Sequence, residues 1–225
     1  MNSTPIALVT GANRGIGLEV AAQLATDHAV LLAARDARKA EQAAAALAGR
    51  GVEVTPLVLD VTSPGSIAAA AARVDRLDVL VNNAAVHYDT WQGAVDADLG
   101  VVVEALETNL LGPWRVTQAF LPALRQGRGR VVNVSSEAGS VAAFSPGVPA
   151  YRVTKTALNT LTRLFAAELA EDGVSVLAAC PGWTATEMGG EGGRPVPEGA
   201  ASVVAAVRAE GGSGGFFRDG APLAW

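Results

Sequence analysis

The sequence predicts a doubly wound α/β domain, in which helices cover both faces of a parallel sheet. Short apolar segments alternate with Ala-rich helical segments along the chain. The apolar segments are continuous runs rather than alternating patterns, which is typical of strands buried on both faces. A chain of 225 residues, 50% of them hydrophobic, can bury a full core. We see no linker or internal repeat, so we expect residues 1–225 to form a single domain.

The first strand and helix are joined by a glycine turn. Residues 6–10 are a short apolar run that ends in this turn, and we expect a strand there. Residues 15–28 carry apolar side chains at helical spacing, at Ile16, Val20 and Leu24. This spacing predicts a helix that begins within the turn.

The next two units repeat this order. Residues 29–34 are a second apolar run, and the segment 36–49 predicts a helix that begins at an acidic cap and ends at glycine. A third strand is expected over 52–59. Residues 63–74 open with Ser-Pro, which favours the first turn of a helix.

The middle of the chain predicts the longest helices. Strands are expected over 78–82 and 130–135, and a long helix between them over 101–126, broken near a Gly-Pro pair. A second long helix is expected over 150–172.

The end of the chain completes the sheet. Strands are expected over 174–180 and 215–218, with a short helix over 198–209 between them, which makes about seven strands in all. Two glycine-rich stretches, 189–199 and 211–215, are expected to be mobile.

The turn after the first strand is the first candidate site. In doubly wound sheets, ligands bind at the carboxyl ends of the strands, near the switch in strand order. Glycines allow the backbone to approach a pyrophosphate, and the following helix N-terminus offers free N–H groups to the anion. The expected contacts with a dinucleotide are Gly11, Asn13, Arg14, Gly15, Ile16 and Gly17.

Arg35 and Asp36 follow the second strand, where a dinucleotide site reads the adenosine ribose. An acid there would accept the 2′-hydroxyl of NAD, whereas an arginine would pair with the 2′-phosphate of NADP. Asp36 also fits a helix N-cap, which is the interpretation that we favour. We therefore expect Arg35 and Arg14 to bind the 2′-phosphate.

Two more strand ends offer cofactor contacts. Asp60 and Val61 end the third strand, and Asn82 ends the fourth. Asp60 could bond the adenine amino group, and the small Ala84 would let a ribose lie against the backbone. Each of these residues could also belong to an ordinary turn.

Tyr151 and Lys155 are four residues apart on a predicted helix and therefore share one face. Lys155 is one of only two lysines among 17 basic residues, which suggests that arginine would not serve at this position. An ammonium beside a phenol favours the phenolate and lowers the phenol's pKa from about 10. Tyr151 is therefore a candidate proton donor.

Together with Asn109, Ser136 and the pair Pro181-Gly182, these motifs resemble the short-chain dehydrogenase/reductase superfamily, over nearly the whole chain. Within it, the chain is most similar to the NADPH-dependent carbonyl reductases, in which segments resembling residues 33–36, 130–136 and 180–183 recur, as does a terminal Trp. The motifs that carry the resemblance are Thr10-Gly11-x-x-x-Gly15-x-Gly17, Asn82-Asn83-Ala84, Asn109, Ser136, Tyr151-x-x-x-Lys155 and Pro181-Gly182.

The resemblance implies a mechanism. Tyr151 would protonate the substrate carbonyl oxygen, which Ser136 would hold and polarise. Lys155 would bind the nicotinamide ribose and lower the pKa of Tyr151, and Asn109 would hold a water that links Lys155 to solvent. The resemblance also implies cofactor contacts after the sixth strand, from Pro181, Gly182, Thr184 and Thr186.

The residues expected near the substrate match the family pattern less closely than those expected near the cofactor. Ser135 and Ser140 are alternatives to Ser136, because the spacing from Ser136 to the tyrosine is slightly long. Position 85 is Ala where the family usually has Gly, and the segment that usually covers the substrate, between positions 186 and 198, is short. The candidate wall residues are Phe144, Trp183 and His87, although His87 could equally pack within its loop, as could Tyr88 and Trp91.

We therefore expect an NADPH-dependent reductase of a small apolar ketone, aldehyde or quinone. The alternatives are an NAD-linked alcohol dehydrogenase that uses Asp36, and a dinucleotide-sensing protein without chemistry. The net charge of −5 argues against nucleic acid, and the single Cys180 argues against a disulfide framework or a zinc site, so we expect no metal. No signal peptide or membrane span is recognisable, so we expect a cytoplasmic protein. The resemblance implies a homodimer or homotetramer.

Overall fold

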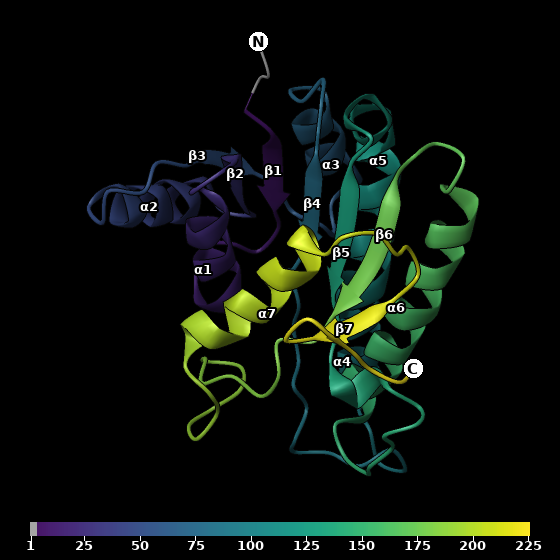
Figure 1. The fold of residues 1–225 in the computed structure, drawn as a ribbon. Coiled ribbons are helices and arrows are strands. Elements are labelled where there is room, and N and C mark those ends of the chain that lie inside the picture. Colours follow the sequence, from purple (N-terminus) through teal and green to yellow (C-terminus); the bar gives the residue numbers. More distant parts are fainter. Residues whose placement is uncertain (1–3) are drawn as a thin grey trace.

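The structure is a computed structural model that describes residues 4–225. Its centre is an eight-stranded sheet in the order β3-β2-β1-β4-β5-β6-β7-β8 (Figure 1). All neighbouring strands are parallel except β7 and β8. The strands are β1 Ile6–Val9, β2 Ala29–Ala34, β3 Thr55–Val58, β4 Val79–Asn82, β5 Arg130–Val134, β6 Ser175–Ala179, β7 Phe216–Arg218 and β8 Ala221–Pro222.

Helices cover both faces of this sheet. Those on one face contribute to the core cluster around Val9 and Leu24, and those on the other to the cluster around Leu8 and Phe120. Adjacent strand residues thus point to opposite faces, as a pleated strand requires. The first face carries α1 Gly15–Leu24, α2 Ala37–Ala48 and α7 Val196–Arg208, and the second carries α3 Pro64–Ala71, α5 Gly112–Gly127 and α6 Pro149–Glu168.

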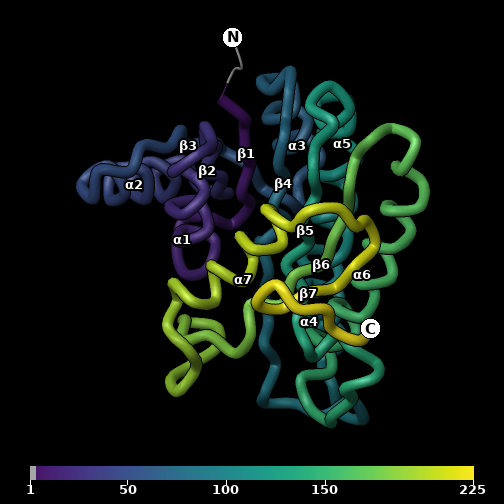
Figure 2. The backbone as a smooth tube through the Cα atoms, viewed as in Figure 1, coloured from purple at the N-terminus to yellow at the C-terminus, as the bar shows by residue number. Residues whose placement is uncertain are grey.

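The strand order reverses at β1. The chain runs from β1 outward through β2 to β3, and then returns to place β4 on the other side of β1. Ligand sites in such sheets lie beyond the carboxyl ends of the strands at this switch point. The loops after β4 and β5 extend to the same side of the molecule, as Figure 2 shows.

The predicted α/β fold is confirmed, with one strand more than expected. The eighth strand has only two residues and forms a hairpin with β7. It is too short to appear as an apolar run in the sequence. The predicted third strand over 52–59 shortens to Thr55–Val58.

The helix expected over 101–126 is divided into three parts. Helix α4 (Leu99–Leu106) leads into a π-helical segment, Glu107–Leu111, and α5 begins at Gly112. The break thus falls near the Gly-Pro pair as predicted, but it widens the helix rather than ending it. Within residues 4–225, no helix is long and apolar enough to cross a bilayer.

Candidate active site

The turn between β1 and α1 can be built only with glycine at its key positions. Gly11 and Gly15 have φ angles of +62° and +56°, in the left-handed region. A Cβ atom on Gly11 would lie 2.8 Å from the Cα of Ala84, and one on Gly17 would collide with the side chain of Asn83. The backbone is therefore left bare where a dinucleotide would approach.

The N-terminus of α1 fits an anion. Arg14 is the N-cap residue, but its side chain makes no capping hydrogen bond. The N–H groups of the first helical turn are thus available for a phosphate, which the helix dipole also favours. The Arg14 guanidinium forms an ion pair with Glu187, from the segment after β6, a partner that no sequence pattern indicated.

Asn83, which sequence reasoning missed, holds the glycine turn in place. Its amide donates to the carbonyl oxygens of Thr10 and Gly11, at 2.9 and 3.2 Å, and its N–H donates to the Thr10 hydroxyl at 3.0 Å. The side chain of Asn82 lies elsewhere, in the core, where it donates to the Oδ1 of Asn133 at 2.9 Å. Only the backbone of Asn82 is thus left to meet a cofactor.

The end of β2 presents an arginine to solvent. Arg35 is exposed, and no carboxylate among residues 4–225 pairs with it. The Asp36 side chain accepts the N–H of Lys39 at 3.0 Å as the N-cap of α2, which confirms the favoured interpretation. Beyond β3, Asp60 is partly exposed and accepts both the N–H and the hydroxyl of Thr62.

Helix α6 brings Tyr151 and Lys155 together. The Lys155 ammonium lies 5.4 Å from the centre of the Tyr151 ring and donates to the carbonyl oxygen of Val134 at 2.7 Å. The hydroxyl of Ser136, just beyond β5, shares a hydrogen bond with the Tyr151 phenol. Tyr151 thus lies between a serine hydroxyl and a buried ammonium.

The two alternative serines are engaged elsewhere. The hydroxyl of Ser135 donates to Asn159 at 2.5 Å, and that of Ser140 accepts the N–H of Ala143 at 3.1 Å. Both are buried, whereas Ser136 lines the cavity next to Tyr151. Ser136 is therefore the serine that a substrate could meet.

Burial governs the ionisation of both catalytic candidates. It raises the pKa of Tyr151 well above its usual value, and the hydrogen bond from Ser136 offsets this only in part. The pKa of Tyr151 is thus raised and not lowered as expected, because burial is the largest influence on it. Burial also lowers the pKa of Lys155, to about 8. Tyr151 is a neutral phenol at neutral pH, the form that can donate a proton.

Asn109 occupies the π-helical segment and is fully buried. Its Oδ1 accepts the N–H of Val86 at 2.8 Å, and its amide donates to the Val86 carbonyl and to the Thr154 hydroxyl. Both N–H donors are therefore used to anchor the loop after β4 against α6. The water contact implied for Asn109 stays a prediction. Single π-helical turns are frequent at functional sites.

Ser136 and Tyr151 line a cavity of about 350 Å³. Trp183 is part of its wall, as predicted for a substrate contact, and Tyr88 packs edge-on against Tyr151 with ring centres 5.2 Å apart. His87 and Phe144 do not line it, contrary to expectation. The His87 ring forms a hydrogen bond with the Glu104 carboxylate at 2.7 Å. Phe144 is exposed to solvent, and the guanidinium of Arg152 lies over its ring.

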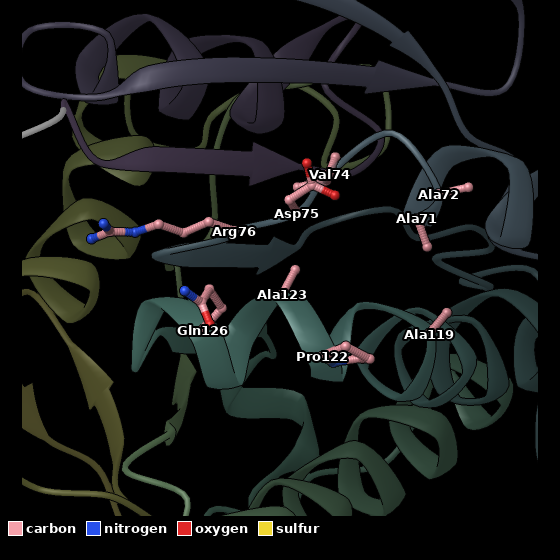
Figure 3. A pocket seen from close by; sticks show the side chains of 9 residues that line it. All are labelled: Ala71, Ala72, Val74, Asp75, Arg76, Ala119, Pro122, Ala123 and Gln126. Carbon is pink, nitrogen blue, oxygen red and sulfur yellow. The ribbon is translucent and has the colours of Figure 1, made fainter.

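A second hollow lies far from this chemistry. It is a groove of about 580 Å³ between the end of α3 and the middle of α5 (Figure 3). Asp75 and Arg76, at one rim, precede β4, so the groove lies at the amino end of that strand, opposite the candidate site. The residues that line it are Ala71, Ala72, Val74, Asp75, Arg76, Ala119, Pro122, Ala123 and Gln126.

A comparison with known families decides the class of protein. The family model for short chain dehydrogenases matches residues 5–195, most of the chain. The protein is a short-chain dehydrogenase. It is therefore an oxidoreductase.

Individual relatives agree with this assignment. The short-chain dehydrogenase anuI of Penicillium roqueforti is 35% identical over 224 residues, covering 90% of this chain and 88% of anuI. Among solved structures, the NADPH-bound carbonyl reductase from chicken fatty liver is 31% identical, with a TM-score of 0.87 over the full length of both chains. The carbonyl reductase Sniffer of D. melanogaster is 26% identical, with a TM-score of 0.88 over both full chains.

In this short-chain dehydrogenase, the segment after β6 is folded back on itself. Gly182 has a φ of +68°, and bridges join Thr184 to Arg194 and Thr186 to Gly190. The guanidinium of Arg194 donates to the carbonyl of Pro181 at 2.7 Å and to the carboxylate of Asp219 at 2.8 and 3.0 Å. The glycine-rich segment, expected to be mobile, is thus fastened at its base.

Proposed function

We propose that this short-chain dehydrogenase reduces a carbonyl group of a small substrate with NADPH, using Tyr151 as the proton donor. The observation that carries the proposal is the Tyr151–Ser136 hydrogen bond in the wall of the cavity, with the Lys155 ammonium beside the phenol ring. The Tyr151 phenol keeps its proton at neutral pH, which suits carbonyl reduction, because in that direction the enzyme must supply a proton.

Each residue then has a distinct task. Ser136 donates a hydrogen bond to the carbonyl oxygen and holds it beside the phenol. Tyr151 transfers its proton to that oxygen, and Lys155 stabilises the phenolate that is left. Bound NADPH would supply the hydride.

The chain's own residues support a dinucleotide site at the switch point. The bare glycine turn and the uncapped start of α1 would hold the pyrophosphate. The proposed contacts beyond β3 and β4 are Asp60, Val61 and the backbone of Asn82 and Ala84, and those after β6 are Pro181, Gly182, Thr184 and Thr186. The four residues after β6 line the cavity itself, as does Ile16.

The preference for NADPH is proposed from the end of β2. Arg35 is exposed with no carboxylate partner in the part of the chain that the structure describes, and the Asp36 carboxylate caps α2. The chicken relative was solved with NADPH, which supports the same choice. The NAD-linked alternative would instead use the Asp36 carboxylate, one oxygen of which caps α2. A dinucleotide sensor without chemistry would not need the Tyr151–Ser136–Lys155 arrangement.

The direct test is the Tyr151→Phe variant. We expect carbonyl reduction, followed as NADPH oxidation with para-nitrobenzaldehyde and menadione, to fall by about 100-fold or more, because a positioned proton donor contributes about 10²–10⁴-fold. NADPH binding, measured by fluorescence titration, should be retained because the ring is kept. Undiminished turnover in this variant would refute the proposed mechanism.

A further inference from the structure

The catalytic helix α6 begins without a cap of its own. Val148 is the N-cap residue, yet its side chain makes no capping hydrogen bond and its backbone is left-handed, with φ 45° and ψ 55°. Pro149 follows as the first helical residue. The N–H groups of the next two residues, Ala150 and Tyr151, therefore need acceptors from elsewhere.

Asp89 supplies both acceptors from a distant part of the chain. Its Oδ2 accepts the N–H of Ala150 at 2.9 Å, and its Oδ1 accepts the N–H of Tyr151 at 3.0 Å. Oδ2 also accepts the side-chain amide of Gln92 at 2.9 Å. The residue is completely buried. A carboxylate thus holds the backbone of the proposed proton donor itself.

The same short segment holds the side chain of Tyr151. Tyr88, next to Asp89, places its ring edge-on against the Tyr151 ring at 5.2 Å. His87, before it, has a φ of 56°, and Val148, at the other side of the junction, has a φ of 45°. Positive φ in residues other than glycine costs free energy and persists only where surrounding contacts impose it. The junction between the two segments is therefore built under strain.

The Asp89 carboxylate stays charged despite its burial. Burial alone would raise its pKa, but the hydrogen bonds from Gln92, Ala150 and Tyr151 more than offset this and hold the pKa below its usual value. An anion at a helix N-terminus is also favoured by the helix dipole.

We propose that Asp89 is a positioning residue, which fixes the Tyr151 phenol for proton transfer by capping α6 across the chain. The proposal rests on the proposed role of Tyr151. Asp89 itself touches neither the cavity nor the reacting atoms. Its loss should therefore slow the chemical step and leave cofactor binding alone, since a misplacement of about 1 Å in a reacting group can cost about 100-fold in rate.

The test compares Asp89→Asn and Asp89→Ala with the wild type under saturating NADPH and para-nitrobenzaldehyde. Asn keeps one acceptor oxygen, so we expect kcat to fall about 10-fold, and about 100-fold for Ala, which keeps none. The KM for NADPH should stay within about twofold of the wild type, because no cofactor contact is lost.

A second capped helix provides the matched control. Asp98 caps α4 by accepting the N–H of Gly100 at 2.8 Å, but it is exposed and outside the proposed site. Asp98→Ala should lower the melting temperature and leave kcat unchanged when all variants are assayed well below melting. If Asp89→Asn keeps the wild-type kcat, or loses activity only in proportion to its unfolded fraction, the positioning role is wrong.

A variant with a milder change covers the case in which the Asp89 variants do not fold. Gln92→Leu removes one donor to the carboxylate, and with it the acceptor of the Asp98 N–H, but leaves both backbone bonds to Asp89 possible. We therefore expect kcat to fall about 3-fold at unchanged NADPH KM. An unchanged kcat there would also overturn the proposal. The two proposals fail in different ways. If Tyr151→Phe keeps its turnover, the proposed function is refuted. If Tyr151→Phe is inactive but the Asp89 variants are fully active, only the positioning role is refuted.

Discussion

Arg35 and Asp36 are neighbours, yet their side chains have different surroundings. The carboxylate of Asp36 is fixed to the start of α2, while the guanidinium of Arg35 faces solvent at the end of β2. Arg35, together with Arg14, is therefore proposed to decide which dinucleotide is preferred. A charge-assisted hydrogen bond to a phosphate contributes about 1.5–3 kcal/mol.

The Arg35→Ala variant tests this choice. We expect the KM for NADPH to rise about 10-fold or more and the KM for NADH to stay the same, because only NADPH carries the 2′-phosphate. Arg38→Ala is the matched control, an exposed arginine one turn further along α2. Equal effects on the two cofactors, or a wild-type preference for NADH, would count against Arg35.

The residue types of the site could be predicted, but their environments could not. The spacing of Tyr151 and Lys155 places them on one helix face whatever surrounds them. The pKa of Tyr151 depends on burial, which comes from loops that the local sequence does not specify. For the same reason, neither Asp89 nor Asn83 was expected, since each acts on a segment more than 60 residues away along the chain.

At the scale of elements, the segment after β6 is the part whose behaviour differs most from expectation. Its glycines predicted mobility, but Arg194 ties its base to Pro181 and Asp219. The exposed pair of Arg14 and Glu187 joins its tip to the glycine turn. Since exposed ion pairs contribute little, the Arg194 contacts at the base should dominate.

Arg194→Ala should therefore loosen this segment. We expect faster limited proteolysis within residues 183–193. We also expect the KM values for NADPH and for NADH to rise equally, by about 3-fold or more, because the segment borders the proposed cofactor site away from the 2′-phosphate. Arg208→Ala provides the control, since Arg208 pairs with Asp27 at the other end of α7. Unchanged proteolysis in Arg194→Ala would show that other contacts hold the segment.

The elements themselves were largely predictable, because continuous apolar runs and helical spacing reflect burial in the sheet and its covering layers. The exceptions have physical reasons. The strand β8 is too short to leave a pattern, and a π-helical turn has nearly the same apolar spacing as the helix around it. The long-range bonds of Asn109 to Val86 and Thr154 accompany that widening and are not visible locally.

At the scale of the whole molecule, apolar side chains remain exposed on α4, α5 and α6. Their exposed fractions are 72% for Leu99, 56% for Val103 and 50% for Leu164. Val153 and Trp114, on α6 and α5, are exposed as well. Large exposed apolar patches mark sites of association. We propose that this face pairs two copies of the chain, as implied for the family.

Light scattering coupled to size-exclusion chromatography would test the pairing. The wild type should elute as a dimer or tetramer, and Leu164→Glu should shift it to the monomer, because a buried, unpaired charge at an interface is strongly unfavourable. Val58→Glu is the control, an exposed valine on β3 at the far edge of the sheet. A monomeric wild type would contradict the prediction.

The cap of α6 also has a consequence for the order of folding. Its acceptor, Asp89, lies 61 residues before Ala150, so the helix cannot acquire its native start from neighbouring residues. The bond can form only once β4 and the loop after it are in place, and closing such long loops is slow and entropically costly. We expect the first turn of α6, and with it the Tyr151 phenol, to become ordered late in folding. The sheet would then form before the proposed proton donor reaches its final position.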